Sequence, residues 1–202
     1  MEYFAADPRV LSQINRHYKT GEKLPDAVIE KLCATKKIFS AVELQAQLFY
    51  SSMDQTLHSG PRDGADLGSC VQEVAEQCHS LPGVPLAAYH HRSQYFLIVG
   101  FFILFCNRFS HLVGYGARYY SYMMARSVAS AIWQKSFQSD PWSREAGVRY
   151  RDECLAHGGG KPSHLLVGDH LGCQLAPDQL AAALIQAGEY LAQEKFENIF
   201  EF

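Results

Sequence analysis

The pattern that most constrains the fold is a run of apolar residues between Ser40 and His58. Apolar side chains recur there at steps of three and four, at Val42, Ala46, Phe49, Met53 and Leu57. This spacing places them on one face of an α-helix, so the sequence predicts a long amphipathic helix over 40–58. Because such a helix must bury its apolar face, we expect it to pack against other elements.

Shorter helices are predicted on both sides of it. Asp7-Pro8 combines an N-cap residue with a proline suited to the first helical turn, and Thr20-Gly21 ends that element. A further helical pattern begins at Pro25, with Val28, Ile29 and Leu32 on one face, and another covers Leu67 to Cys78. A third continues beyond the tyrosines to near Phe137, and two more begin at Asp140-Pro141 and Pro177-Asp178. No alternating stretch argues strongly for a sheet, so the predicted class is mainly α.

Composition excludes several classes of partner. The chain has 202 residues, enough for one domain with a core, and its 48% hydrophobic and 19% charged residues are typical of a globular protein. A net charge of −3 gives no electrostatic reason to bind nucleic acid or an anionic membrane. The six cysteines form no Cys-x-x-Cys pair, which favours reduced structural thiols.

The most distinctive segment is HLVGYGARYYSY, residues 111–122. If a helix begins near Gly116, Tyr115, Tyr119 and Tyr122 share one face at spacings of four and three. Their hydroxyls, beside His111, would form a row of donors able to hold a peptide carbonyl or the oxyanion that develops when water attacks one. The alternative is a tyrosine-rich core helix whose hydroxyls bond to neighbouring backbone. Both interpretations remain open on the residues alone.

This string resembles a segment of the thimet oligopeptidase family of zinc metallopeptidases, and within it the mitochondrial intermediate peptidases. MEYFAADPRV near the start and EAGVRYRDECLAHGGG further on resemble other segments of the family in the same order. The resemblance covers nearly the whole chain except residues around 93–108. It implies that residues 1–202 are the helical C-terminal portion of a zincin-type oligopeptidase catalytic domain.

The resemblance also implies roles for individual residues. Tyr115 and Tyr122 match tyrosines that contact substrate and stabilise the tetrahedral intermediate, which makes them the expected catalytic residues. His111, Gly114, Gly116 and Tyr119 match substrate-binding positions, and the two glycines would let the loop close over a substrate. His111 matches less closely, because the spacing from histidine to tyrosine is one residue shorter than in the thimet oligopeptidases.

The family's zinc motif is missing. Its chemistry needs a His-Glu-x-x-His helix and a downstream glutamate, and no such motif occurs in the chain. Glu2 falls after the matching position of the downstream ligand, and His164, His170 and Cys173 are too loosely spaced for a structural zinc site. We therefore expect zinc in the full-length family, no ligands for it here, and no peptidase activity of the isolated chain.

Residues 93–108 interrupt the pattern. Tyr95 to Cys106 is an apolar run without a charge, shorter than the roughly 17–25 residues that span a bilayer. A buried strand or core helix is the ordinary interpretation. Joining Arg92 directly to Phe109 restores the family's spacing, so our hypothesis is an insertion, such as a translated intron.

The resemblance implies the function of a matrix-located mitochondrial metalloendopeptidase. It would act on a peptide or precursor protein and remove short N-terminal peptides from imported precursors, as a monomer without nucleic-acid or membrane partners. The first 20 residues lack the form of a targeting segment. The alternative is a non-catalytic helical module that binds peptides. A membrane-associated protein anchored by Tyr95–Cys106 is a third hypothesis.

Overall fold

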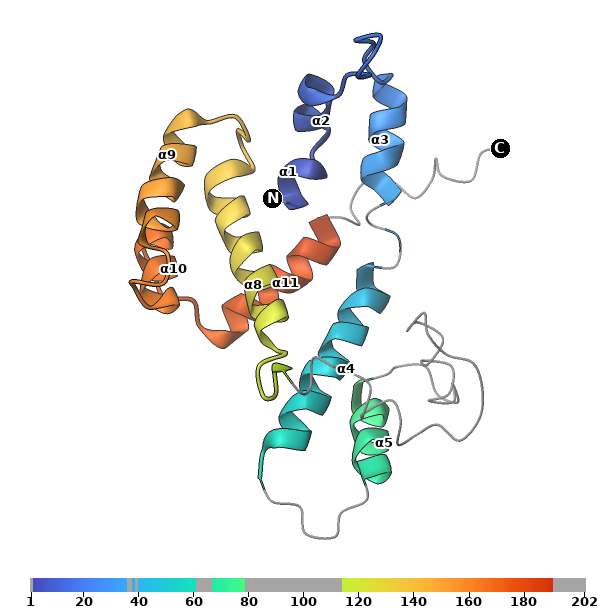
Figure 1. Cartoon of the computed structure of the whole chain (residues 1–202), viewed down its shortest axis with the longest axis vertical. Coiled ribbons are helices and arrows are strands. Elements are labelled where there is room, and N and C mark those ends of the chain that lie inside the picture. Colours follow the sequence, from blue (N-terminus) through green and yellow to red (C-terminus); the bar gives the residue numbers. More distant parts are fainter. Residues whose placement is uncertain (1, 36–37, 39, 61–66, 79–113, 191–202) are drawn as a thin grey trace, which may run out of the picture. The chain divides into compact units, whose positions relative to one another are not determined.

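The computed structural model describes residues 2–35, 38, 40–60, 67–78 and 114–190 (Figure 1). Every regular element assigned in these ranges is a helix, which confirms the mainly α class. None of the helices within these ranges is long and apolar enough to cross a membrane. The chain divides into two compact units, one of residues 1–40 with 124–202 and one of residues 41–123. Each is described by itself.

The first unit begins with helices α1 (Glu2–Ala5), α2 (Pro8–Ile14) and α3 (Asp26–Thr35). Asp7 caps α2 by accepting the Arg9 amide, as predicted. The prediction that this element ends at Thr20-Gly21 is wrong, because the Asn15 side chain accepts from the Leu24 amide and the backbone leaves the helix after Ile14. The buried face of α3 is also different, and consists of Ile29 and Cys33.

The C-terminal part of this unit holds the remaining helices. They are α8 (Ser121–Ile132), which enters the unit at Met124, the π-helix η2 (Trp133–Phe137), α9 (Arg144–Glu153), the 3₁₀ turn Leu155–His157, α10 (Ser163–Leu171) and α11 (Pro177–Tyr190). Gly158 ends the 3₁₀ turn with a φ of 52°, a positive value that glycine adopts without steric cost. The start of α11 at Pro177 is confirmed.

The predicted helix start at Asp140-Pro141 is wrong. Asp140 accepts the Trp142 amide in a local turn, and Ser143 is the N-cap of α9 through its hydroxyl. Two residues with capping side chains therefore occur in succession, and the later one begins the helix. The sequence pattern cannot distinguish them, because aspartate and serine cap equally well.

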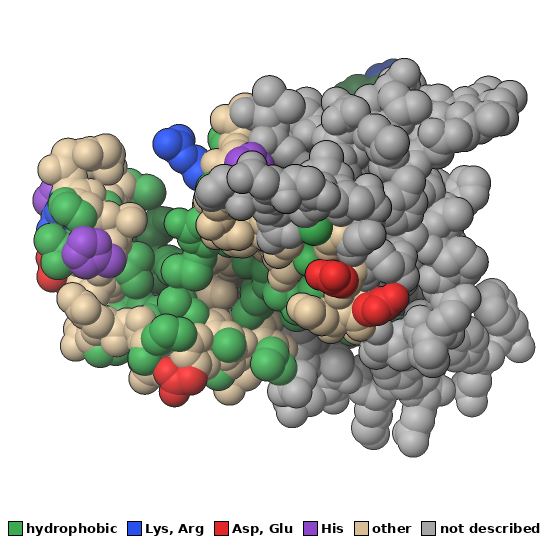
Figure 2. Space-filling view, turned by 90° about the horizontal axis from the view of Figure 1, so that it is seen from below, with side chains coloured by type: hydrophobic (Ala, Val, Ile, Leu, Met, Phe, Trp, Pro, Cys, Tyr) green, Lys and Arg blue, Asp and Glu red, His purple; other side chains and the backbone are tan. Residues whose placement is uncertain are grey.

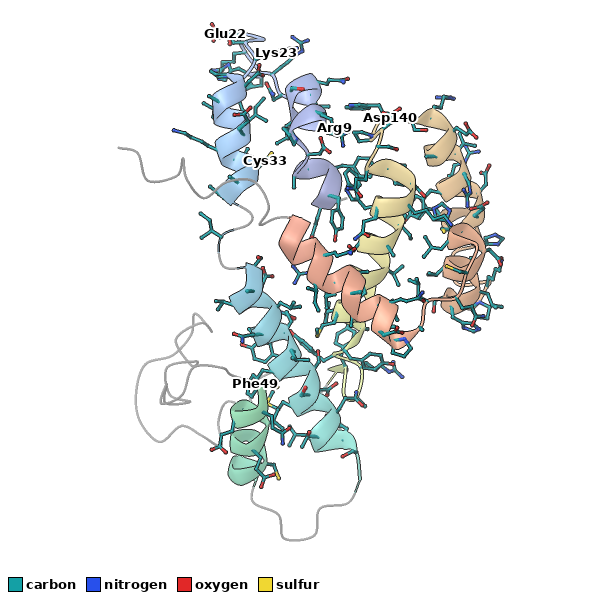
Figure 3. The ribbon with its side chains drawn as sticks, turned by 180° about the vertical axis from the view of Figure 1, so that it is seen from behind. Arg9, Glu22, Lys23, Cys33, Phe49 and Asp140 are labelled. Carbon is teal, nitrogen blue, oxygen red and sulfur yellow. The ribbon has the colours of Figure 1, made fainter. Side chains whose placement is uncertain are left out.

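Aromatic rings and one arginine join the ends of this unit. The rings of Tyr3 and Phe4 lie 5.5 and 4.9 Å from that of Trp133, and Phe4 also contacts Phe137. Arg9 extends from α2 toward the segment that ends in Asp140 (Figure 3), where it donates to the carbonyls of Gln138 and Ser139. The N-terminal helices are thus fixed to the end of η2.

Among its described residues the second unit contains α4 (Ser40–His58) and α5 (Leu67–Cys78), which lie side by side (Figure 1). Both occupy the ranges predicted from periodicity. Phe49 and Met53 of α4 pack with Val74 and Ala75 of α5, and Figure 3 shows Phe49 directed from α4 toward α5. Met53 has no exposed surface, so the core of this unit lies along this seam.

Candidate functional site

The tyrosine segment is a turn that precedes a helix. Helix α8 begins at Ser121, so the expectation of a start near Gly116 is wrong, and Tyr115 and Tyr119 do not share a helical face with Tyr122. Ala117 has a φ of 61° and is the one non-glycine residue of the described chain with a positive φ. This left-handed conformation interrupts the helix that the pattern predicted.

Asp54 of α4 holds this turn through its carboxylate. Its Oδ1 accepts the Ala117 amide at 3.0 Å and its Oδ2 accepts the Tyr119 amide at 2.8 Å. Asp54 is completely buried, and His58 Nδ1 lies 3.0 Å from its Oδ1. The next residue of the helix, Gln55, donates its amide to the Ala117 carbonyl at 3.0 Å. Both peptide groups of Ala117 are therefore bound to α4.

Tyr119 lies along one polar stripe of α4. Its hydroxyl donates to Gln47 Oε1 at 3.2 Å, its ring meets Tyr50 at 5.8 Å, and its amide reaches Asp54. Gln47, Tyr50 and Asp54 are spaced by three and four residues, so they share one helical face. Burial raises the pKa of Tyr119, the Tyr50 and Tyr122 phenols raise it further, and the Gln47 hydrogen bond acts in the opposite direction. Tyr119 is therefore a neutral, buried anchor of the segment.

Tyr115 and Tyr122 are placed differently from Tyr119. They are 53% and 42% exposed, and the Tyr122 ring lies 5.0 Å from that of Tyr119. The same segment exposes Tyr120 (48%). Hydrophobic and aromatic side chains are also exposed elsewhere on the described surface, as Figure 2 shows. A phenol with an accessible ring can stack on a peptide and donate its O–H to a carbonyl oxygen.

The other predicted site residues are less fully described. Gly114 is exposed, with no heavy atom within 4 Å of the position that a Cβ would occupy, and Gly116 is half-buried. The left-handed residue of the turn is Ala117, immediately after Gly116. His111 lies outside the described residues.

Sequence reasoning missed Gln47, Tyr50, Asp54 and Gln55. It used α4 only for its apolar stripe and assigned no role to its polar positions. The available signal was the recurrence of polar residues at helical spacing beside that stripe, which is also how a polar seam is encoded. The sequence did not show what these residues bind, because the segment that they contact lies 62–72 positions further along the chain.

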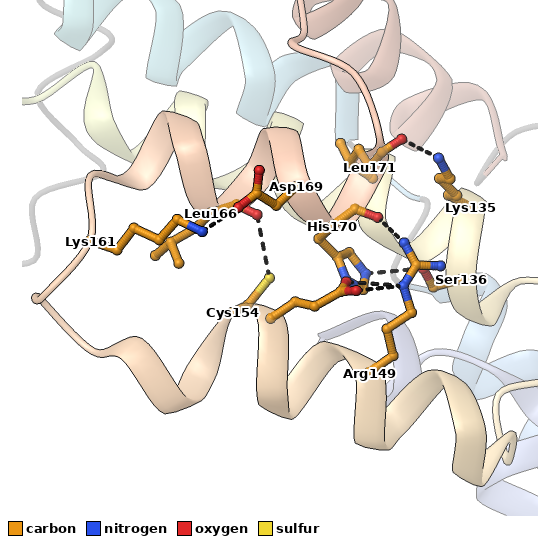
Figure 4. Close-up of polar contacts among 10 residues, drawn as sticks. Lys135, Ser136, Arg149, Cys154, Lys161, Leu166, Asp169, His170 and Leu171 are labelled. Atoms are coloured by element: carbon orange, nitrogen blue, oxygen red, sulfur yellow. Dashed lines mark hydrogen bonds and ion pairs between the residues drawn. The ribbon is translucent and has the colours of Figure 1, made fainter.

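A second polar cluster joins α9, α10 and η2 in the first unit (Figure 4). His170 Nδ1 lies 2.7 Å from Glu153 Oε2 and its Nε2 lies 3.1 Å from Ser136 Oγ, an order that hydrolase triads also use. His170 has no exposed surface, however, and Arg149 donates to its carbonyl. This cluster fastens the three helices together, and no substrate can approach the imidazole.

The described residues contain no group of three or more His, Cys, Asp or Glu side chains that could hold a metal ion. His164, His170 and Cys173, considered above as ligands, do not form one. Together with the absence of His-Glu-x-x-His from the sequence, the donor set of the described chain does not fit a zinc site.

Comparison with known proteins identifies the family. The model of peptidase family M3 matches residues 1–185, so the chain belongs to this family. It is 43% identical to mouse mitochondrial intermediate peptidase over 185 residues, 92% of this chain, and 42% identical to the human protein over the same length. The Arabidopsis thaliana protein of the same name is 34% identical over 194 residues. The chain spans about a quarter of the length of these relatives (24% for mouse and 25% for Arabidopsis).

Proposed function

We propose that this chain supplies the peptide-binding part of a metalloendopeptidase that resembles mitochondrial intermediate peptidase. The whole enzyme would act in the mitochondrial matrix and remove short N-terminal peptides from imported precursors. Family membership and the names of the relatives support this activity. The observation that carries the assignment to this chain is that exposed Tyr115 and Tyr122 flank a turn whose backbone amides are bound by α4.

Within this proposal the tyrosines have distinct roles. Tyr115 and Tyr122 donate hydroxyl hydrogens to the peptide, and to the oxyanion as it forms, where donors are most effective. Tyr119 is buried and does not contact the peptide, and its ring packs against that of Tyr122. Gly114, Gly116 and His111 stay predicted substrate-binding positions. At the two glycines the absence of a side chain lets a peptide backbone approach closely.

In this proposal zinc is held by another part of a longer protein. Because the described residues do not fit a zinc site and the sequence contains no His-Glu-x-x-His motif, we propose that the chain alone is inactive and that it is the C-terminal portion of the catalytic domain. Purified chain is expected to leave a fluorogenic peptide intact with zinc added. Cleavage abolished by a chelator would contradict this.

A graft tests the active role. The 185 residues of mouse mitochondrial intermediate peptidase that match this chain would be replaced by the corresponding residues of this chain. We expect a chelator-sensitive peptidase. In it, Tyr115→Phe and Tyr122→Phe should each lower kcat by about 10²–10³, the loss typical of an oxyanion donor.

The matched control for the graft is Tyr120→Phe, which removes a hydroxyl of similar exposure from the same segment. It is expected to change kcat less than about threefold, as for surface substitutions generally. Equal losses in all three variants would refute the roles assigned to Tyr115 and Tyr122.

A non-catalytic peptide-binding module is the second candidate. The observation in its favour is that the sequence holds a tyrosine segment without a His-Glu-x-x-His motif. A graft that binds zinc and folds but cleaves nothing, together with a chain that binds peptide, would favour this module.

The hypothesis that residues 93–108 are an insertion also stands as a proposal, and the stretch lies outside the described residues. The hypothesis of a membrane anchor at Tyr95–Cys106 also stands as a proposal about residues outside the described ranges. Sequencing the mature transcript tests the insertion, because a message that retains the stretch would refute a retained intron. Partition of the protein into liposomes tests the membrane anchor.

A further inference from the structure

The buried carboxylate of Asp54 determines the backbone of the tyrosine segment. It accepts two amides from that segment, those of Ala117 and Tyr119, and no part of it is exposed to water. Hydrogen bonds to an ionised group are stronger than neutral ones, and more so away from solvent. Two such bonds to alternate residues fix the direction of the chain between them.

The conformation held by Asp54 is one that the backbone does not favour. An L-residue with a φ of 61°, as at Ala117, is disfavoured relative to a right-handed one because its Cβ lies too close to the following carbonyl oxygen. Conformations of this kind persist where the surroundings over-determine them, and they gather at binding and catalytic sites. Asp54 and Gln55 hold Ala117 in this conformation, because Asp54 accepts a hydrogen bond from its amide and Gln55 donates one to its carbonyl.

This turn sits between the two exposed tyrosines. Tyr115 precedes Ala117 by two residues, and its carbonyl accepts the Arg118 amide at 2.9 Å. Tyr122 follows Tyr119 by three residues, and its amide donates to the Tyr119 carbonyl at 3.2 Å. A change in the backbone at Ala117 or Tyr119 is therefore transmitted to the residues that carry both phenols.

We propose that Asp54 is a positioning residue for peptide binding, which holds the strained turn at Ala117 so that Tyr115 and Tyr122 present their hydroxyls to one ligand. It acts through the backbone and does not touch the peptide. The proposal rests on the proposed function, because it assigns Asp54 to the same peptide site. Gln55 has an auxiliary role at the Ala117 carbonyl.

The carboxylate cannot be replaced by the amide of the same shape. Asparagine offers one acceptor oxygen, so in Asp54→Asn one of the two backbone amides would face an NH₂ donor in a buried position. The turn should then relax toward a commoner conformation and α8 should begin at a different residue. The substitution removes no apolar packing, so the α4–α5 seam retains its contacts.

Amide hydrogen exchange of the whole chain measures the effect on the turn. The readout is the protection of the Ala117 and Tyr119 amides divided by that of the Val74 amide in α5, which cancels global stability. In Asp54→Asn this ratio is expected to fall on the order of tenfold or more. The control is Met53→Ala, which creates a cavity in the adjacent core and should lower the protection of all three amides by the same factor.

Peptide affinity, measured at a temperature where each variant is folded, is the readout that would not change if Asp54 had only a structural role. The probe is a fluorescein-labelled peptide that copies the N-terminal segment of an imported mitochondrial precursor. Asp54→Asn should weaken its binding about tenfold, while Met53→Ala should leave it within about twofold. Gln55→Ala removes an exposed side chain and should still fold, and it should weaken binding about threefold.

The outcomes separate the two proposals. A wild-type chain that binds no peptide counts against the proposed function, and the exchange ratio then still decides whether Asp54 fixes the turn. An unchanged exchange ratio in Asp54→Asn overturns the inference. So does a lower ratio with full peptide affinity, since the turn would then have no bearing on binding. If Asp54→Asn does not fold, equal affinity of Gln55→Ala and wild type overturns it.

Discussion

Asp54 and Tyr119 lie 65 positions apart in the sequence, yet the Tyr119 amide donates to Asp54 Oδ2 at 2.8 Å. The Tyr119 hydroxyl reaches Gln47, two turns earlier on the same helix. One residue is thus held at both ends by one face of α4. This arrangement makes the tyrosine segment part of the α4–α5 unit, and the backbone that carries its exposed phenols is bound to α4.

Replacing Ala117 with glycine is expected to stabilise the protein. Glycine adopts a positive φ without the steric cost of a Cβ, although it also gives the unfolded chain more freedom. The difference of these effects is a gain of about 0.5–1 kcal/mol in the free energy of unfolding. Urea denaturation checks it, with Ala129→Gly, at an exposed position in the interior of α8, as the control that should lose about 1 kcal/mol. A loss at both positions would contradict the conformation of Ala117.

Tyr119 should ionise at a higher pH than an ordinary tyrosine. Burial and the neighbouring phenols raise its pKa above 10.0, so the folded state favours the neutral hydroxyl. That contribution to stability is complete below the unfolded pKa of about 10 and is lost as the pH rises through the higher folded value. An ultraviolet titration of wild type minus Tyr119→Phe should show a late transition. A difference spectrum that titrates with the exposed tyrosines would refute this.

The Asp7–Arg9 pair should make stability fall in acid. Burial alone raises the pKa of Asp7, but the side-chain and backbone hydrogen bonds from Arg9, with its charge, leave this pKa below 3.8. The contribution is complete above that ordinary value and is lost as the pH falls through the lower folded one. Urea midpoints between about pH 6 and pH 2 should fall less in Asp7→Asn than in wild type. Equal slopes would contradict the prediction.

His170→Leu should destabilise the first unit by about 2–4 kcal/mol. The substitution leaves Ser136 without its buried partner and removes the bond to Glu153, which are the costly kinds of change. His164→Leu, at an exposed position of the same helix, should change stability by less than about 0.5 kcal/mol. Thermal unfolding followed by circular dichroism compares them. Similar small effects would show that the cluster does not support the fold.

Much of the fold follows from local patterns. The apolar spacing of α4 and α5 and the proline at the start of α11 predicted their positions, because each of these signals lies within the element that it describes. Helix α10 had no such signal, since its residues combine a glycine, two histidines and an aspartate with four apolar side chains. It is stabilised by contacts to α9 and η2 that the sequence pattern does not contain.

The candidate site was predictable in part for the same reason. The tyrosines stood out as a group, but their assignment to one helical face depended on a helix start that Asp54 prevents. A carboxylate on a distant helix competes with the local preference for continued helix, and only the folded structure shows which interaction prevails. The sequence therefore could not show that Tyr119 is buried while Tyr115 and Tyr122 are exposed.

The π-helix η2 has a consequence for how the first unit is assembled. Its wider turn, closed by the Gln138 amide on the Trp133 carbonyl, contains one residue more than an α-helical turn. Neighbouring side chains there reach three different places: Trp133 meets the N-terminal rings, Ser136 meets His170, and Phe137 meets Tyr150. Deleting one residue from this turn would rotate everything after it by about 100° relative to α8. The turn thus sets the direction in which the chain leaves the end of this helix toward α9.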